Sequence, residues 1–467
     1  MAGIKDYKTS ASLNTAVGGV NISENMARSD VNNAMRAMMA DVVKAVPVVV
    51  TVRDLGAKCD GVTDDGAIIN AEIYARYNGL ATSQSQEFVE IHASAGDVLK
   101  FATPVTVRQN RIRFIGNGAK IVCTGAYAFD ITQDGSGNDN QAGAIIDWKI
   151  TGATTAAIRA TAANFWEFKD NWITANAIGI SLNGCIQARV ENNYIRENTG
   201  VGLYIAAATV FGGGIVESQR CHVENNEIWL NGGYGLHLVN GVGHLILGND
   251  FEVNTGRDVY IQAALGMQFR DNYGEPAAGA THIYMDNTAG LVVGRTTAKN
   301  NFDGWLIGGG ATWDINIVAG NSNQFENIVY GTGNINIAAG ASANFIGPAI
   351  GSAPTVTNAG TGTILWHSPG YLGGIKALAG SATIGKNFTG YVDIAGAATT
   401  SAVTLTTEPD AAYHVLTNVS KVGGTPTAGS YNSHLSTFPT TTGFTIELDA
   451  APGVGNTVRV WWMIVRP

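Results

Sequence analysis

Hydrophobic and polar residues alternate in short segments that recur along the middle of this chain. In eight of these segments an Asn stands two residues before Ile, Phe or Gly, and the steps between successive Asn are 22, 33, 23, 23, 28, 23 and 21 residues. The eight are Asn171, Asn193, Asn226, Asn249, Asn272, Asn300, Asn323 and Asn344. Apolar residues lie three before and two after most of them, with polar neighbours between, which is the period of a β-strand. This repeat predicts stacked coils instead of one globular core.

A second Asn follows five residues after each of the first four anchors, at 176, 198, 231 and 254. Columns of stacked Asn are expected at the corners of coils, where side-chain amides hydrogen-bond to the next coil. Each coil then continues into another apolar strand, such as residues 203–205 or 236–238. Three strands per coil of about 22 residues predict an all-β chain, a right-handed parallel β-helix. At about 4.8 Å per coil, residues 47–350 make about 12 coils and a rod of roughly 55–60 Å.

The two ends of the chain do not follow this repeat. Residues 1–46 contain a predicted helix with one apolar stripe, which a short helix cannot bury alone and which we expect to pack on its own copies in an oligomer. Residues 47–368 form the predicted β-helix, and within them residues 64–78, followed by Gly79, predict a helix that covers its open end. Residues 369–467 predict a separate C-terminal β domain of sandwich type.

The composition fits an all-β chain and argues against several classes of function. Gly accounts for 59 of 467 residues and only 14% of residues are charged, which suits strands joined by tight turns. A net charge of −9 without a Lys/Arg cluster argues against a nucleic-acid partner. No apolar run is long enough to span a membrane and no signal peptide is recognisable, so neither membrane insertion nor ordinary secretion is expected. The four Cys are scattered without a CxxC motif, which predicts buried free thiols in a protein folded in a reducing cytoplasm; no cofactor or metal is expected.

One segment resembles a known family. The stretch VRDLGAKCDGVTDDGAIINAEI, residues 52–73, is similar to the N-terminal signature of the pectate-lyase-superfamily domain of bacteriophage tailspikes and some polysaccharide-degrading enzymes. The resemblance implies that Asp64 and Asp65 are structural. It also implies a homotrimer in the phage tail of the virion, assembled in the host cytoplasm. Residues 1–46 would attach the protein to a tail or adaptor protein, and residues 369–467 would serve trimerisation or receptor contact, with a bacterial surface polysaccharide as the partner.

A column of aromatic residues is the candidate binding surface. In the recurring third strand the middle residue is expected to face outward, which aligns Tyr204, His237, Tyr260 and Tyr284. Two residues upstream the outward column contains Asp258 and His282, and two residues downstream it contains Asp286. Because sugar rings stack on aromatic faces and carboxylates bind hydroxyls, these residues predict a glycan-binding groove. The alternative is that single exposed aromatic residues on a β surface have no function.

Candidate catalytic residues are the carboxylates that the repeat brings one coil apart. Glycosidic hydrolysis uses two carboxyl groups about 5–5.5 Å or 6.5–9.5 Å apart. Glu191 pairs with Glu224, and Glu227 pairs with Asp250, each pair separated by one coil or about 5 Å. Mutual repulsion can raise the pKa of one member enough to make it an acid. Asp258 is a further candidate, although its backbone lies roughly 14 Å from that of Asp286.

The chain lacks the motifs of two related chemistries. It has none of the polygalacturonase motifs, residues 243–245 match only part of that family's GHG, and it has no Asp cluster for the calcium ion of pectate lyases. The leading interpretation is a phage tailspike or tail fibre that binds a host polysaccharide, with cleavage of that polysaccharide as a separate hypothesis. The alternatives are a non-enzymatic structural adhesin that binds its receptor through residues 369–467, and a free secreted polysaccharide lyase, which the missing export signal disfavours.

Overall fold

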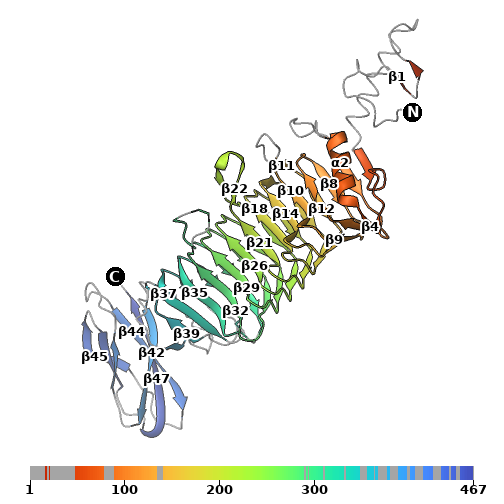
Figure 1. Ribbon diagram of the computed structural model, residues 1–467. Helices are drawn as coiled ribbons and strands as arrows, with labels where there is room; N and C mark the ends of the chain where they lie inside the picture. Colours follow the sequence, from red (N-terminus) through yellow and green to blue (C-terminus); the bar gives the residue numbers. More distant parts are fainter. Residues whose placement is uncertain are drawn as a thin grey trace.

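The computed structural model shows short parallel strands stacked along one axis (Figure 1). It describes most of the β-helix and the strands beyond it. The described residues are 16–17, 20–21, 48–77, 89–133, 140–288, 291–292, 294–308, 311–330, 333–347, 355–361, 363–365, 376–378, 388–396, 400–404, 414–423, 433–440, 443–448 and 453–465. The predicted helix within residues 1–46 lies outside them.

Three parallel sheets run along the rod, and most coils contribute one strand to each sheet in the same order. Among the described residues the first sheet has 13 strands: β3 (Val48–Thr51), β5 (Val89–His92), β8 (Ile112–Ile115), β12 (Ala144–Ile146), β16 (Glu167–Lys169), β19 (Arg189–Glu191), β24 (His222–Glu224), β27 (Leu245–Leu247), β30 (Gln268–Arg270), β33 (Asn301–Asp303), β36 (Gln324–Glu326), β38 (Phe345–Ile346) and β40 (Ile364–Leu365). The described part of the second sheet has 10: β4 (Asp60–Asp64), β6 (Val98–Phe101), β9 (Lys120–Cys123), β13 (Lys149–Thr151), β17 (Trp172–Thr174), β20 (Tyr194–Arg196), β25 (Glu227–Trp229), β28 (Asp250–Glu252), β31 (Tyr273–Glu275) and β34 (Leu306–Ile307). The third sheet has 12 described strands: β7 (Val105–Val107), β10 (Tyr127–Ile131), β14 (Ala156–Thr161), β18 (Ile180–Asn183), β21 (Leu203–Ala206), β26 (Tyr234–Val239), β29 (Arg257–Gln262), β32 (Thr281–Asp286), β35 (Trp313–Asn321), β37 (Asn334–Ser342), β39 (Thr355–Asn358) and β41 (Lys376–Leu378). This is the predicted parallel β-helix, and its last parallel strand lies beyond the expected boundary at residue 368.

The predicted register is confirmed wherever the repeat was regular. Val190 lies opposite Val223, and Ile195 lies opposite Ile228, across the 33-residue step as well as the shorter ones. The extra residues of that step therefore leave the coil as a loop and do not shift the strands. That loop contains a small hairpin, β22 (Ala208–Thr209) and β23 (Ile215–Val216), with a short 3-10 turn between them at Phe211–Gly213. A two-strand pairing of β11 (Asn140–Gln141) with β15 (Ala163–Asn164) joins two coils nearer the N-terminus.

The interior is a continuous column of apolar side chains. Phe269, Phe302 and Phe325 stack on consecutive coils with ring centroids 4.5 Å apart. Trp148 and Trp305 are also fully buried. Because identical positions stack directly, each added coil buries its apolar side chains against the coil before it, and stability accumulates along the rod.

Asn ladders at the corners hold the coils in register. At the corner between the first and second sheets, each Asn donates its backbone N–H and its side-chain N–H to the side-chain oxygen of the Asn on the next coil. This ladder contains Asn171, Asn193, Asn226, Asn249 and Asn272. The corner between the second and third sheets has the predicted second ladder, which contains Asn176, Asn198, Asn231 and Asn254. The residue before most of these Asn is left-handed, for example Asn225 at φ 55° and Leu230 at φ 55°, and this turns the chain from one sheet to the next.

The assignment of all eight anchors to one column is wrong. Asn300, Asn323 and Asn344 form a third ladder, at the corner that enters the first sheet. The 28-residue step marks the place where the anchors pass from the first ladder to the third. In the column of the first ladder, the residue after Asn272 is Trp305, whose side chain is buried in the core. In the third ladder His244 and Met267 replace Asn as acceptors: the N–H of Cys221 donates to His244 Nδ1 at 3.0 Å, and the N–H of His244 donates to Met267 Sδ at 3.4 Å.

Helix α2 (Asp65–Tyr77) covers the first coil, as predicted. Ile69 and Ile73 are buried on its inner face. Asp64, just before the helix, and Asp65, its first residue, are structural. Asp64 accepts hydrogen bonds from the backbone N–H groups of residues 102 and 103, and Asp65 accepts them from the backbone N–H groups of residues 58 and 59. The carboxylates therefore fasten the cap to the first coils.

The described strands after the β-helix are antiparallel. They form two three-stranded sheets, β42 (Phe388–Gly396), β47 (Gly453–Val465) and β44 (His414–Gly423), and β43 (Thr400–Thr404), β46 (Gly443–Leu448) and β45 (Ser433–Thr440). Near the N-terminus, β1 (Ala16–Val17) pairs antiparallel with β2 (Val20–Asn21). The role of residues 369–467 in trimerisation or receptor contact stays a prediction.

Removing one ladder Asn tests how far these corners hold the rod together. Asn226→Ala removes five hydrogen bonds of the side chain and leaves the N–H of Asn193 and the C=O of Val190 buried without that partner. We expect a loss of about 3 kcal/mol or more in unfolding free energy. Thermal unfolding followed by circular dichroism at one fixed scan rate measures it. The matched control is Asn301→Ala, because the amide oxygen of Asn301 has no partner in the structure; an equal loss of Tm in both variants would contradict the role of the ladder.

Candidate functional site

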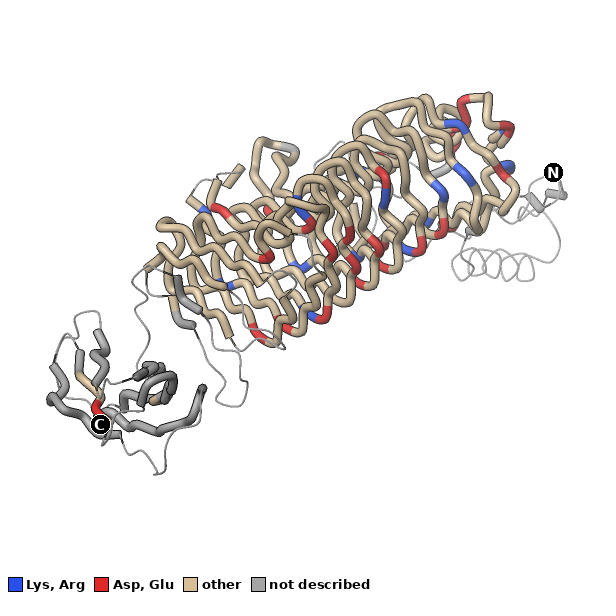
Figure 2. Tube along the Cα trace, turned by 90° about the horizontal axis from the view of Figure 1, so that it is seen from below, with Lys and Arg blue, Asp and Glu red and all other residues tan. Residues whose placement is uncertain are grey.

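The coil has three faces, and the predicted site residues are distributed over all of them. Glu191 and Glu224 lie on the first sheet, and Glu227 and Asp250 on the second. The aromatic column lies on the third sheet. Each predicted pair is in direct register on neighbouring strands, but the pairs and the aromatic column do not share one surface within a chain. Charged residues recur along one long edge of the stacked coils, as Figure 2 shows.

The outer face of the second sheet combines aromatic and acidic side chains in two columns. The first column runs through Trp172, Tyr194, Glu227, Asp250 and Tyr273 on β17 to β31. The second runs through Thr174, Arg196, Trp229, Glu252 and Glu275 on the same strands. We call the carboxyl groups of Glu227, Asp250, Glu252 and Glu275 the carboxylate cluster.

An aromatic platform lies directly before the carboxylate cluster along the rod. The rings of Trp172 and Tyr194 stack at 4.9 Å with planes 12° apart, and both side chains are more than a third exposed. The guanidinium of Arg196 lies between Trp172, at 5.1 Å from the ring centroid, and Trp229, at 4.8 Å. Stacked rings and a sandwiched guanidinium make a flat surface that is stiff before any ligand arrives.

Burial and like charge perturb the titration of the carboxylate cluster. Partial burial, reinforced by the neighbouring Glu252 and Glu227, raises the pKa of Asp250 to about 7. Burial, followed by the charge of Glu275, raises the pKa of Glu252. The hydrogen bond between Glu252 and Asp250 lowers the pKa of Glu252, so the shared proton resides on Asp250. A hydrogen bond to Glu227 raises the pKa of the Tyr194 hydroxyl. Near neutral pH Asp250 therefore retains its proton in a large fraction of molecules, beside carboxylates that are one coil away or on the same strand.

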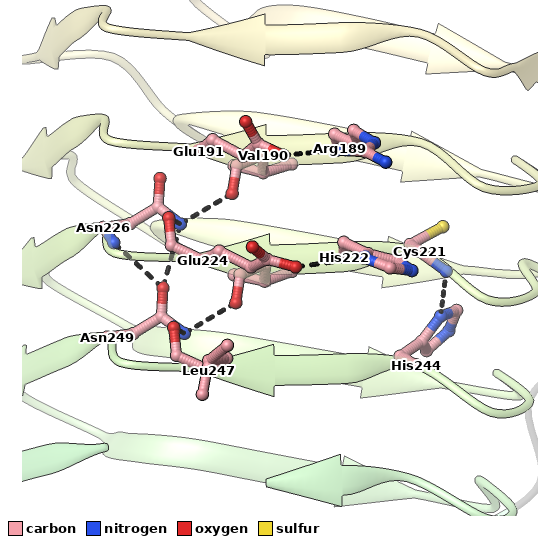
Figure 3. A network of polar contacts seen from close by, with 11 residues as sticks. Arg189, Val190, Glu191, Cys221, His222, Glu224, Asn226, His244, Leu247 and Asn249 are labelled. Carbon is pink, nitrogen blue, oxygen red and sulfur yellow. Dashed lines mark hydrogen bonds and ion pairs between the residues drawn. The ribbon is translucent and has the colours of Figure 1, made fainter. Parts of the chain in front are cut away.

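The pair on the first sheet is built differently. Arg189 lies 3.2 Å from Glu191 and His222 lies 3.0 Å from Glu224, each on its own strand, as Figure 3 shows. Each carboxylate therefore has a partner on its own strand that offsets or shares its charge. Glu191 and Glu224 are brought together as predicted, but each is held by a partly exposed ion pair on its own strand.

The aromatic column of the third sheet faces outward, and its rings touch one another. His237 and Tyr260 stack at 4.5 Å with planes 2° apart, Tyr204 lies 5.3 Å from His237, and Tyr284 lies 5.3 Å from Tyr260. The guanidinium of Arg257 lies 3.6 Å from the ring centroid of Tyr284 and 4.7 Å from that of Tyr260. Burial lowers the pKa of His237 to about 4, so the ring is neutral at physiological pH. Because the ring faces of His237 and Tyr260 cover each other, this aromatic stripe offers ring edges to a ligand at its centre.

Asp258 and His282 do not lie on the surface, and the expectation that they face outward is wrong. Both side chains are fully buried, and His282 Nδ1 lies 2.7 Å from Asp258 Oδ2. The other oxygen of Asp258 accepts the side-chain N–H of Asn254 at 2.8 Å, so Asp258 ends the second Asn ladder. The imidazole occupies the space beside Gly274, where an added Cβ would lie 1.7 Å from His282 Cε1. Strict alternation fails here because two consecutive residues of β29 and of β32, such as Asp258 and Val259, both point inward at the corner.

Asp286 is held within the protein as well. It is only 8% exposed, and it accepts the Tyr260 hydroxyl at 2.7 Å and the backbone N–H of Thr288 at 3.1 Å. The loop after β32 is joined to the loop that carries β22 and β23, because Arg295 pairs with both carboxylate oxygens of Glu217. Asp286 therefore orients Tyr260 and the adjoining loop, and little of its carboxylate is left for a ligand.

The sequence-based prediction omitted the aromatic half of the second-sheet face. Trp172, Tyr194 and Arg196 were not proposed as site residues, and neither was Glu275. The signal was present, since these residues stand one or three positions after a ladder Asn and therefore point outward. In the sequence, the apolar inward positions of the same strands form the more regular pattern.

All four Cys are free and buried, as predicted. Among the residues that the structure describes, no three His, Cys, Asp or Glu side chains converge as a metal site would require. No helix in the described part of the chain is long and apolar enough to cross a membrane.

Comparison with known proteins gives a family match over less than half of the chain. A family model described as periplasmic copper-binding protein (NosD) matches residues 63–274. The described residues do not fit a copper ion: the softest candidates, Cys221, His244 and Met267, are buried in the third ladder, where His244 and Met267 accept backbone N–H groups. The search of curated proteins found no match to this sequence.

Solved structures with a similar course of the chain include a phage protein, an adhesin and an enzyme module. ORF18 of Geobacillus virus E2 is 16% identical, with 94% of this chain and 84% of that chain covered and a TM-score of 0.48. The surface adhesin PfbA of Streptococcus pneumoniae is 13% identical, with 69% and 92% covered and a TM-score of 0.44. The A-module of mannuronan C-5 epimerase AlgE4 of Azotobacter vinelandii is 15% identical, with 70% and 100% covered and a TM-score of 0.47.

Asp250→Asn tests the raised pKa of Asp250 through stability. A carboxyl whose pKa is raised on folding stabilises the fold below its unfolded value of 3.8, and this contribution is lost as the pH rises through about 7. Asn imitates the protonated form, so the variant should gain about 1–2 kcal/mol over the parent at pH 8.5, after allowance for solvent screening, and only about a third of that gain at pH 5. Unfolding at both pH values measures the difference. Asp303→Asn, on the first sheet, is the control, and the same pH-dependent gain there would refute the assignment.

Asp258→Asn separates a structural from a catalytic role of Asp258. The substitution weakens the buried contacts with His282 and Asn254, so we expect a loss of about 2 kcal/mol or more in unfolding free energy. Any activity toward polysaccharide, corrected for the folded fraction, should stay at the parent level, because the side chain has no exposed surface. A large fall in turnover without a fall in Tm would show that Asp258 takes part in the chemistry.

Proposed function

We propose that this chain is a tailspike or tail-fibre type component of a phage virion that binds a bacterial surface polysaccharide and cleaves it on the second-sheet face. The observation that carries the proposal is the register of Glu227 with Asp250, with a raised pKa on Asp250, directly beyond the stacked rings of Trp172 and Tyr194. Glycosidic hydrolysis uses a pair of carboxyl groups, one of which donates a proton, and a flat aromatic surface beside them can bind sugar rings.

Asp250 is the proposed general acid. It transfers its proton to the glycosidic oxygen as the bond from that oxygen to the anomeric carbon breaks, so the leaving sugar departs as a neutral alcohol. The proton is available because burial and the neighbouring carboxylates keep Asp250 protonated in a large fraction of molecules near pH 7.

Glu227 is the proposed partner carboxylate. One coil separates it from Asp250, or about 5 Å between backbones, which suits attack by Glu227 on the anomeric carbon and a covalent intermediate. Water then releases the sugar, with Asp250 accepting its proton. The Tyr194 hydroxyl, which is hydrogen-bonded to Glu227, holds this carboxylate beside the platform.

The virion role is supported by the resemblance of residues 52–73 to the N-terminal signature of phage spikes. The proposal assigns attachment to a tail or adaptor protein to residues 1–46, a homotrimeric assembly to the whole chain, and trimerisation or receptor contact to residues 369–467. The aromatic stripe of Tyr204, His237, Tyr260 and Tyr284 is retained as a secondary glycan contact, away from the place of cleavage.

Loss of either carboxyl group should abolish cleavage. With a panel of purified capsular polysaccharides and lipopolysaccharides, the parent protein is expected to release new reducing ends from at least one polymer. Glu227→Gln and Asp250→Asn should each lower kcat by about 100-fold or more, while the variants still bind the polymer. Reducing-end assays and size-exclusion chromatography measure this.

The matched control is Glu326→Gln, which removes a carboxylate from the first sheet far along the rod. Parent-level turnover in Glu227→Gln and Asp250→Asn would overturn the site. If the parent protein binds a polymer but cleaves none, and residues 369–467 alone still bind that polymer, the structural adhesin is favoured.

A further inference from the structure

The charge around the proposed cleavage site is strongly one-sided. The carboxylate cluster places four acidic side chains on three successive strands, β25, β28 and β31. Burial pushes both Asp250 and Glu252 toward their protonated forms, helped by the charges of Glu252 and Glu227 on Asp250 and of Glu275 on Glu252. An additional negative charge at this place is therefore costly. A ligand that brings another carboxylate or phosphate near Asp250 meets repulsion from every side of the cluster.

The cation nearest to the cluster is already engaged. Arg196 is held between the rings of Trp172 and Trp229, and one of its nitrogens lies 3.0 Å from Glu197. The lysines of this face are farther along: Lys149 lies opposite Trp172, on the side of the platform away from the cluster. Three coils, or about 14 Å, separate Lys149 from Glu227.

The second-sheet face is open at both of its long edges. In the coils from Asn171 to Asn254, the corners on either side of this sheet are single left-handed residues followed by a ladder Asn, without an insertion. The long loops of these and the following coils, such as residues 207–218 and 287–297, leave instead at the corner between the third and first sheets. A polymer on the second sheet can therefore continue beyond the platform on one side and beyond Tyr273 on the other.

We propose that the second-sheet site takes a neutral or amino-bearing polysaccharide, cuts it at internal bonds, and rejects polymers with a negative charge on the sugars next to the scissile bond. This rests on the proposed function, since it specifies the substrate class of the same site. An uncharged chain lies across Trp172 and Tyr194 by ring stacking, and an amino group is attracted by Glu252 and Glu275. The open edges allow binding anywhere along a chain, which gives internal cleavage.

The test uses chemically matched polymers. The best neutral or amino polysaccharide cut by the parent protein is partly oxidised at its primary hydroxyls to carboxylates, and kcat/KM is measured before and after. We expect oxidation to lower kcat/KM at least 10-fold. With the untreated polymer, size-exclusion chromatography should show an early fall in mean chain length, as internal cleavage requires. The double variant Glu252→Gln, Glu275→Gln should raise kcat/KM on the oxidised polymer about 3- to 10-fold over the parent protein. The Glu326→Gln control should leave it unchanged.

Each outcome decides between the claims. If the best substrate of the polysaccharide panel carries a carboxylate or phosphate on every repeat, and its cleavage still depends on Glu227 and Asp250, the inference fails and the proposed function stands. If oxidation leaves kcat/KM unchanged, or products appear only from chain ends, the inference also fails. If no polymer of the panel is cut, the proposed function fails and the inference with it. Melting curves of the double variant confirm that it is folded.

Discussion

Direct stacking of equivalent residues is the constraint on which this structure depends. Parallel strands in successive coils are hydrogen-bonded in fixed register, and the corner ladders repeat the same bond from Asn171 to Asn272. A buried amide that accepts from the coil before it and donates to the coil after it cannot shift by one residue without leaving several polar groups unpaired. The ladder therefore converts a period in the sequence into straight columns of side chains on the surface.

These columns generate the chemistry proposed for the second sheet. A β-helix places like residues about 4.8 Å apart whether or not their charges agree. On the first sheet, for example, Arg189 lies 3.2 Å from Glu191 and offsets its charge. On the second sheet four carboxyl groups are stacked, and the backbone prevents them from moving apart. The result is a raised pKa on Asp250, which is a cost to stability and a source of an acid near neutral pH.

Departures from the repeat have identifiable physical reasons. Where Gly274 replaces the apolar residue of its column, the ring of His282 fills the space. Where the second ladder ends, Asp258 replaces Asn as the acceptor and takes a hydrogen-bonding partner in His282. Where the third ladder lacks Asn, His244 provides a ring nitrogen; burial lowers its pKa to about 3, which keeps the ring neutral and able to accept. Polar residues that look functional in the sequence are in these cases parts of the interior.

The sequence by itself determined the coil, the register and the neighbours of each side chain, because a strand period of two and a coil period in the low twenties are both visible in a single chain. It correctly paired Glu227 with Asp250 and Tyr204 with His237. Only the tertiary structure decided which face each column occupies, since the left-handed corner residues set the angle between strands and interrupt the alternation beside them. That is why Asp258 lies in the core, and why the aromatic stripe and the carboxylate cluster lie on different faces.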